Sequence, residues 1–282
     1  MIEFIIVAII QGLLEWIPVS SSGQVMIISI NFFGISPTNA YSLAIWLHLG
    51  TSLSVLLKFK RDFIQIIKSF FTKQSEGNDN PTVIKRNWII VATIGTALTG
   101  IPIYFAFKVF LEDVYVAAHG DIITLVISGF LIITGMVLFL RKKISGMKQI
   151  SNLNKKIFQS DSFIGGLVQG FSVLPGISRS GITVSAILME KYTQKDALTL
   201  SFLISVPAAF GSILVDLFFG QGSIFGSMDL ITIAIITIVS FLVGYTTIEL
   251  FLKIAQKIEF GYFCIVYGVL SYIIIIPFFL LA

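Results

Sequence analysis

The feature that most constrains this chain is its series of long apolar stretches. A helix needs about 20 apolar residues to cross a bilayer. Six stretches reach that length, and only 12% of the residues are charged, about half the share of an average soluble domain. The sequence therefore predicts an all-α polytopic membrane protein in which residues 1–282 form a single membrane domain. The predicted full transmembrane helices lie at about 40–58, 87–107, 122–140, 197–219, 228–251 and 260–281.

Four shorter apolar pieces are too short to cross the membrane singly. They occur as two pairs, at about 2–17 with 25–33 and at about 162–174 with 182–190, and a segment rich in Pro, Gly and Ser separates the members of each pair. Irregular backbone is tolerated at membrane depth where protein or a cavity surrounds it. Each pair therefore predicts a re-entrant helical hairpin.

The two hairpins are also related by an internal repeat. Three residues of the first hairpin recur in the second, each 158 positions later. An odd number of predicted spans separates the hairpins, so the second copy should have inverted topology, which places the broken helices face to face near the midplane. The sequence thus predicts two inverted repeats, at about 1–120 and 121–282. The recurring residues are Gln11, Gly12 and Gly23 in the first copy and Gln169, Gly170 and Gly181 in the second.

Lysine and arginine gather in loops on one side of this layout. The loops at about 58–86 and 141–160 are rich in both, whereas residues 220–229 contain neither. Cytoplasmic loops of membrane proteins carry such an excess. We therefore expect a multi-pass protein of the plasma membrane with the basic loops in the cytoplasm and both termini outside. The net charge of +4 belongs to these loops and does not indicate nucleic-acid binding.

The second hairpin carries an arginine at a depth where a membrane disfavours charge. Arg179 is flanked by apolar stretches, and a charge at the bilayer centre costs at least about 2.5–3.5 kcal/mol on insertion scales. Its guanidinium presents a planar fork of donors that matches phosphate oxygens. This pattern predicts an anion site within the membrane protein. The alternative is that Arg179 only forms a buried ion pair with Glu15.

The loop around this arginine supports the anion site. Ser178 and Ser180 add hydroxyl donors, and Gly176 and Gly181 free the backbone to approach a ligand. A helix beginning near Ile182 would point its positive end at the loop. Donors from side chains and backbone therefore converge in one short segment.

The first hairpin supplies a carboxylate and a run of hydroxyls. Glu15 and Gln11 lie four residues apart, on one face of a helix, where they could hold a divalent cation or position a water or a hydroxyl. The alternative is a glutamate at a helix end that faces solvent. Ser20, Ser21 and Ser22 follow, and they could attack phosphorus, bind it, or cap a helix.

Three further polar residues receive weaker interpretations. Gln24 can donate and accept hydrogen bonds but cannot transfer a proton at neutral pH. His48 is interpreted as a hydrogen-bonded helix histidine in preference to a catalyst. Asp216 lies within a predicted span, and we expect it near the outer end of that span.

The motifs of both hairpins resemble those of the undecaprenyl-diphosphate phosphatase (bacitracin resistance) family. The family's first motif is Glu/Gln-x-x-x-Glu followed by Pro-Val-Ser-Ser-x-Gly-His, and its second is Pro-Gly-x-Ser-Arg-Ser-Gly, which this chain matches in full. The resemblance covers nearly the whole chain. It implies hydrolysis of a polyprenyl diphosphate to the monophosphate that carries glycans across the membrane. The matching residues are Gln11, Glu15, Pro18, Val19, Ser20, Ser21 and Gly23, and Pro175, Gly176, Ser178, Arg179, Ser180 and Gly181.

The resemblance also implies roles for these residues. Ser21 would be the nucleophile or a phosphate ligand, Glu15 the base or a metal ligand, and Arg179 would stabilise charge on the transferring phosphoryl group. A divalent cation, Mg²⁺ or Ca²⁺, is compatible with a diphosphate beside a carboxylate, although the sequence contains no dedicated metal cage. The expected substrate-binding residues are Gln11, Ser20, Ser22, Gln24, Ser178, Ser180, Gly176 and Gly181.

One departure from the family pattern opens a second interpretation. The family's loop histidine falls on Gln24 in this chain. Glu15 would then have to act as the base, or the protein would bind the lipid phosphate without hydrolysing it. A polyprenyl-phosphate transporter or flippase is therefore the alternative function, because inverted repeats with broken helices are typical of carriers. The sequence predicts no organic cofactor and is compatible with a homodimer.

Overall fold

The chain folds into helices joined by short connections, as a computed structural model shows. The structure describes residues 1–282 except 72–79, 117–119, 142–145, 151–154, 221–222, 224–225, 227, 256–259 and 282. Parts of the predicted basic loops, Lys73, Lys142 and Lys143 among them, lie outside the described residues. Every named element of the described part is helical. The predicted all-α class is therefore confirmed.

Long apolar helices occupy the predicted spans. Five of them are long and apolar enough to cross a membrane, which agrees with a polytopic membrane protein. The apolar part of the sixth, Gly261–Ile276, is shorter in the described residues, so its full crossing stays a prediction. The six helices are α3 (Pro37–Lys58), α5 (Pro81–Val116), α6 (Gly120–Arg141), α9 (Gln194–Phe219), α11 (Leu230–Ala255) and α12 (Phe260–Leu281).

The four shorter apolar pieces form four shorter helices in two pairs, and a loop separates the two members of each pair. They are α1 (Ile2–Leu14), α2 (Ser21–Phe33), α7 (Lys155–Gly170) with the short helix η3 (Phe171–Val173), and α8 (Arg179–Met189). The start of α8 corrects the sequence prediction, which placed it near Ile182. The helix begins three residues earlier because Ser178 caps it, its hydroxyl accepting a hydrogen bond from the N–H of Gly181 at 3.2 Å.

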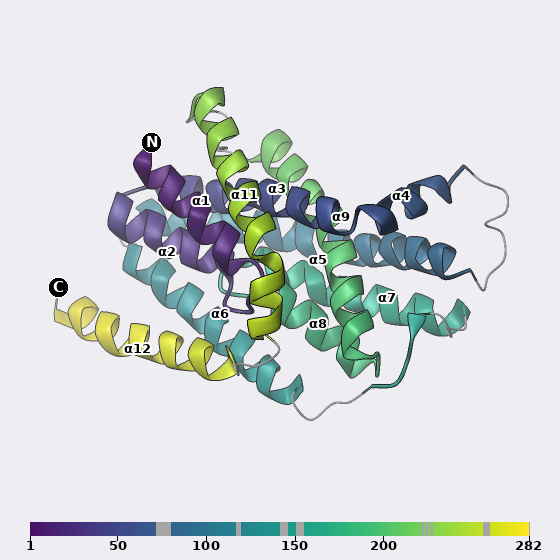
Figure 1. The fold of residues 1–282 in the computed structure, drawn as a ribbon. Coiled ribbons are helices and arrows are strands. Elements are labelled where there is room, and N and C mark those ends of the chain that lie inside the picture. Colours follow the sequence, from purple (N-terminus) through teal and green to yellow (C-terminus); the bar gives the residue numbers. More distant parts are fainter. Residues whose placement is uncertain are drawn as a thin grey trace.

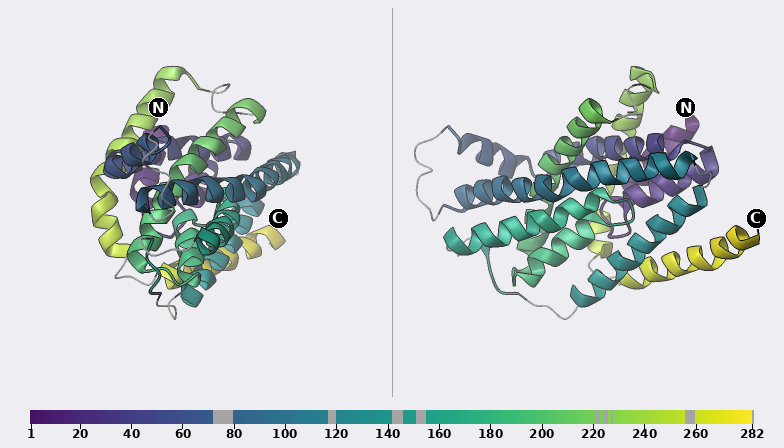
Figure 2. Two further views of the ribbon diagram at one scale, coloured as in Figure 1. Left: turned by 90° about the vertical axis from the view of Figure 1, so that its right-hand side faces the viewer. Right: turned by 180° about the vertical axis from the view of Figure 1, so that it is seen from behind.

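One further helix, α4 (Lys60–Lys68), follows α3 directly and was not predicted. It carries charged and apolar residues on different faces, and Asp62 pairs with Lys85 of α5 at 2.6 Å. Both chain termini lie at one end of the molecule, and α4 lies at the opposite end (Figures 1 and 2). This arrangement agrees with termini and basic loops on opposite sides of a membrane.

The packing of the helices follows a paired pattern. Helix α1 packs against α11, and α7 packs against α5; α2 lies against α3, and α8 lies against α9. Two further pairs are α3 with α9 and α6 with α12. These pairs are symmetric along the chain. If each helix of the series α1, α2, α3, α5, α6 is replaced by the helix at the same place in the series α7, α8, α9, α11, α12, and the reverse, the same set of pairs results. Helices α9 and α11 cross α3 and α5 steeply (Figure 1).

A buried ion pair joins three of the long helices near one end of α9. Asp216 accepts hydrogen bonds from the ammonium of Lys108 at 3.1 Å and from the hydroxyl of Tyr104 at 2.7 Å, both on α5. The hydroxyl of Ser42, on α3, also donates to Asp216. Asp216 is three residues from the last residue of α9, Phe219. These contacts account for the carboxylate that the sequence left unexplained within a span.

Candidate active site

The α1–α2 loop and the η3–α8 loop touch each other directly. The hydroxyl of Ser20 caps α2 by accepting from the N–H of Gly23 at 3.3 Å, and it also accepts from the N–H of Gly176 in the other loop at 2.9 Å. A Cβ on Gly23 would lie 2.9 Å from the nitrogen of Gly176, so a larger residue at position 23 would force the loops apart. The two loops are therefore held in a fixed relation.

The local geometry of the two loops repeats along the chain. Ser20 and Ser178 each cap the helix that follows by accepting from an N–H three residues later, at 3.3 and 3.2 Å. Each capping hydroxyl also lies close to the hydroxyl of the serine two residues later. The distances are 3.4 Å from Ser20 to Ser22 and 3.3 Å from Ser178 to Ser180. The cap, one of the roles left open for Ser20, is thus present, and Ser178, which was predicted only as a hydroxyl donor, caps α8 in the same way. By the same offset of 158 residues, Ser21 and Arg179, the first residues of α2 and α8, are counterparts.

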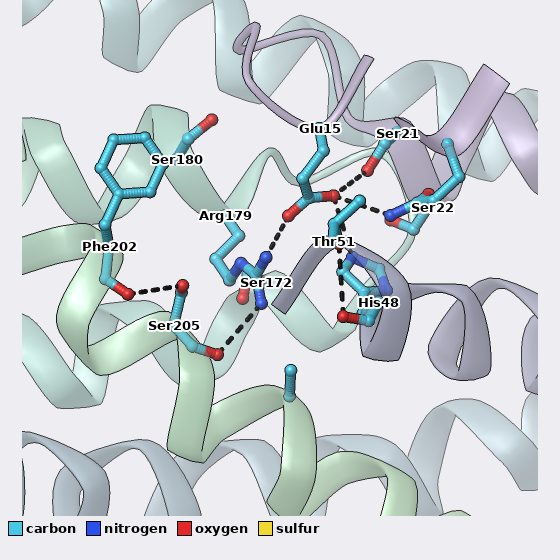
Figure 3. Close-up of polar contacts among 12 residues, drawn as sticks. Glu15, Ser21, Ser22, His48, Thr51, Ser172, Arg179, Ser180, Phe202 and Ser205 are labelled. Atoms are coloured by element: carbon cyan, nitrogen blue, oxygen red, sulfur yellow. Dashed lines mark hydrogen bonds and ion pairs between the residues drawn. The ribbon is translucent and has the colours of Figure 1, made fainter. Parts of the chain in front are cut away.

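Glu15 lies at the centre of the site, directly after α1. It is 7% exposed, so the alternative of a helix-end glutamate facing solvent is wrong. One carboxylate oxygen pairs with the guanidinium of Arg179. The other accepts from the hydroxyl of Ser21 at 2.7 Å and from the amide nitrogen of Gln11 at 2.7 Å. Figure 3 shows Glu15 between Arg179 on one side and Ser21 on the other.

Arg179 reaches from α8 to two other elements. Besides the ion pair with Glu15, its Nη1 donates to the backbone carbonyl of Ser205 on α9 at 3.3 Å (Figure 3). The predicted ion pair is therefore present. The guanidinium also lines a cavity, and it has five N–H donors, of which these contacts use a part. The pair alone thus leaves donors free to face a ligand.

The two loops, together with α3, α5 and α9, line an open cavity with about 730 Å³ of empty space. Its lining carries one carboxylate, one guanidinium and the hydroxyls of both loops. Helices α2 and α8 both begin at this cavity. The N–H groups in the first turn of a helix have no partner within the helix. The cavity is thus suited to an anion. The predicted site residues that line it are Glu15, Ser20, Ser21, Ser22, Ser178, Arg179 and Ser180.

The other predicted site residues lie around the cavity and not on its wall. Gln11 contacts Glu15 through its amide nitrogen. Gly176 has φ +102 and no room for a Cβ, which would lie 2.4 Å from the carbonyl oxygen of Ile127. A Cβ on Gly181 would lie 3.1 Å from that of Ser178. Gln24 is 8% exposed, and its amide nitrogen has no hydrogen-bond partner among the described residues. The glycines shape the loop, whereas nothing around Gln24 shows a contact with the cavity.

His48 of α3 lines the cavity, although the sequence favoured a purely structural helix histidine at this position. Its Nδ1 lies 2.6 Å from the carbonyl oxygen of Ala44, which confirms the predicted helix hydrogen bond. Because a carbonyl oxygen can only accept, Nδ1 carries a proton. The other ring nitrogen, Nε2, lies 3.4 Å from the carboxylate of Glu15 (Figure 3). His48 therefore places a group that can gain and lose a proton directly beside the carboxylate.

Gln169 is a second residue of the site that the sequence marked only as part of a repeat. It lines the cavity, is 1% exposed and donates through its amide nitrogen to the carbonyl of Ile204 at 3.2 Å. Its amide oxygen has no hydrogen-bond partner among the described residues. A buried acceptor of this kind, in a residue that lines the cavity, is left without a protein partner in the described part of the chain.

Together, the fold and the cavity define a class: a helical membrane protein with a cavity, lined by a carboxylate and an arginine at two helix N-termini, that is suited to an anion. The family model of the bacitracin resistance protein BacA matches residues 4–273. The chain belongs to this family, and the resemblance drawn from the motifs is confirmed.

Three relatives show how far the similarity extends. The chain is 36% identical over 270 residues to a protein of Methanothrix thermoacetophila, covering 96% of this chain and 95% of the relative. It is 38% identical over 277 residues to one of Methanococcoides burtonii, covering 95% and 96%. A protein of Methanopyrus kandleri is 34% identical over 266 residues, covering 94% and 92%. Each of the three is named undecaprenyl-diphosphatase.

Proposed function

We propose that this chain is an integral membrane phosphatase that hydrolyses a polyprenyl diphosphate of the undecaprenyl type. The products are polyprenyl phosphate and inorganic phosphate, which recycles a glycan carrier lipid. The observation that carries the proposal is the position of Glu15 between the Ser21 hydroxyl and the Arg179 guanidinium. The relatives named undecaprenyl-diphosphatase support the substrate class.

Ser21 is the proposed nucleophile and Glu15 its base. The serine hydroxyl already donates to the carboxylate at 2.7 Å, which is the geometry that proton abstraction needs. As the oxygen of Ser21 bonds to the terminal phosphorus, its proton passes to Glu15. The bond from that phosphorus to the bridging oxygen breaks, and polyprenyl phosphate leaves. Water then hydrolyses the phosphoserine, which releases phosphate and restores Ser21.

Arg179 and the two helix N-termini stabilise the charge that this reaction develops. The phosphoryl group in transfer carries negative charge on its outer oxygens, and positioning with electrostatic stabilisation supplies most of the catalysis of such reactions. A planar guanidinium can bind two of these oxygens at once. The first turns of α2 and α8 add backbone N–H groups at the same place.

His48 supplies the proton-transfer group that Gln24 cannot. Its Nε2 lies beside the carboxylate that receives the proton of Ser21, and its Nδ1 is held by the carbonyl of Ala44. The imidazole can take up a proton from Glu15 or return it to the leaving group, and histidine is the side chain best suited to this near neutral pH. An active enzyme without the family's loop histidine is therefore chemically reasonable.

A divalent cation is proposed here as a partner of the substrate and not as a resident of the protein. Both oxygens of Glu15 already accept from protein donors, and the described residues contain no group of three His, Cys, Asp or Glu side chains that could hold a metal ion. These residues do not fit a resident cation. Mg²⁺ or Ca²⁺ would instead arrive with the diphosphate, whose oxygens and water would supply most ligands.

The proposed architecture is a pair of inverted repeats with two re-entrant hairpins, α1–α2 and α7–α8. The paired packing of the helices and the repeated serine caps support it. In this arrangement α6 belongs with the first copy, because it pairs with α12 as α3 pairs with α9. We therefore place the boundary after α6 and not near residue 120. The termini are proposed to lie outside the plasma membrane.

The experiment that tests the function is phosphate release by the purified protein. It should be given farnesyl diphosphate and a longer polyprenyl diphosphate in detergent. We expect one phosphate and one prenyl monophosphate per substrate, and loss of release in Glu15→Gln. Binding of prenyl monophosphate without any release would favour the carrier alternative, which the diphosphatase names of the relatives do not support.

A further inference from the structure

A second hollow lies between α5 and α9, beside the polar cavity. It has about 530 Å³ of empty space and an almost wholly apolar wall. Its α5 side extends from Thr93 to Tyr104, a length of about 16 Å at 1.5 Å per helical residue. Its α9 side includes Pro207, Gly211 and Val215. We call this hollow the α5–α9 groove.

The α5–α9 groove adjoins the polar cavity. Thr96, Val173, Ala208 and Ser212 line both. A molecule with a phosphate head and an apolar tail could therefore place its head in the cavity and its tail in the neighbouring groove. No other chemistry suits this combination as well, because the cavity favours an anion and the groove excludes one.

The groove is open on the side away from the cavity. Ile101, which lines it, is 41% exposed, and the apolar side chains of Phe105 and Leu214 beside it are 41% and 51% exposed. In a polytopic protein such apolar helix surfaces face lipid. The remainder of a long chain could thus continue from the groove into the bilayer.

The groove is not a general consequence of this helix packing. The pair α3 and α11 corresponds to the pair α9 and α5, and it is closed: a Cβ on Gly50 would lie 2.6 Å from the carbonyl oxygen of Thr237. On α9, by contrast, a Cβ on Gly211 would meet nothing within 4 Å. Each glycine is a single position on its interface; α3 is packed tightly at Gly50, whereas α9 has room at Gly211.

We propose that the α5–α9 groove binds the isoprene units next to the diphosphate and so selects long prenyl chains. This proposal rests on the proposed function. It gives the substrate one direction, with the diphosphate between the two loops and the chain leaving between α5 and α9. Chain length beyond the groove should contribute little to binding.

Substitution of Gly211 tests the groove. Gly211→Leu adds a side chain to the groove wall at a position where a Cβ meets nothing within 4 Å, and it introduces a better helix former, so the fold should persist. The ratio of KM for a long polyprenyl diphosphate to KM for dimethylallyl diphosphate should rise about tenfold, or about 1.4 kcal/mol. Gly211→Ala should have a smaller effect of the same sign. Leu242→Phe, at an exposed position of α11 that does not line the groove, should leave the ratio as in the wild type. An unchanged ratio in Gly211→Leu would overturn the proposal.

A photoreactive farnesyl monophosphate separates this proposal from the phosphatase activity, because labelling needs no hydrolysis. We expect labelled peptides from α5 or α9, containing Ile101 or Val215, and competition by farnesyl phosphate. Labelling there in a protein that releases no phosphate would keep the groove and refute the phosphatase. Phosphate release with labelling confined to other helices would refute the groove and keep the phosphatase.

Discussion

The buried ion pair between Lys108 and Asp216 should be costly to break and far less costly to remove. Their side chains are only 6% and 5% exposed. Removing one partner of a buried pair leaves an uncompensated charge, which costs about 3–5 kcal/mol, whereas replacing both with apolar residues is often neutral. In Lys108→Met, Asp216 would retain, among the described residues, the hydroxyl donors of Tyr104 and Ser42.

The magnitudes follow from these contacts. We expect Lys108→Met and Asp216→Leu each to lose about 3–5 kcal/mol of unfolding free energy. The double variant should lose only about 1–3 kcal/mol, because the hydroxyl of Tyr104 loses its acceptor while no charge is left unpaired. The two substitutions should thus be strongly non-additive, as expected for residues in direct contact.

Unfolding by SDS in mixed micelles would measure these differences, with the thermal midpoint as a second readout. Lys58→Met is the matched control, since it breaks the ion pair between Lys58 and Glu249. The side chains of these two residues are 33% and 64% exposed. That exposed pair should contribute less than about 1 kcal/mol. The reasoning would be refuted if Lys108→Met resembled Lys58→Met, or if the double variant lost the sum of the single losses.

Two further predictions concern proton transfer and topology. Gln24→His should keep or raise phosphate release. His48→Gln should reduce phosphate release by about 100-fold, within the range of general acid–base catalysis. A phosphate assay in which Gln24→His lost activity and His48→Gln kept it would exclude His48 from the reaction. In a Cys264→Ser background, an impermeant thiol reagent added outside intact cells should label Gly226→Cys but not Met147→Cys, because the basic loops face the cytoplasm; labelling of Met147→Cys alone would reverse the orientation.

The elements of this fold could be predicted from the sequence where apolar composition decides them. The spans were found because a bilayer demands long apolar stretches. Their ends were not, because a helix continues past the apolar part: α5 covers Pro81–Val116, whereas the apolar stretch covers about 87–107. Helix α4 was missed for a related reason, since it is short, charged on one face and part of a loop by composition.

The centre of the site could also be predicted, but its surroundings could not. The repeat offset of 158 residues indicated that Glu15 and Arg179 would approach each other. His48 gave no such signal, because α3 is buried on most of its surface and periodicity therefore does not reveal which face meets the cavity. The partners Lys108 and Asp216 lie 108 residues apart, a separation at which only the folded chain shows the contact.

The central claim is that Arg179 binds the phosphoryl group and does more than neutralise Glu15. Phosphate release by Arg179→Lys tests this most directly, because lysine preserves the charge beside Glu15 but lacks the planar fork. Folding should be checked first by the unfolding assay. We predict that release from a polyprenyl diphosphate falls by about 100-fold or more, as for loss of a donor to a transition-state oxyanion. Release within about threefold of the wild type would show that the charge alone suffices and would contradict the proposed clamp.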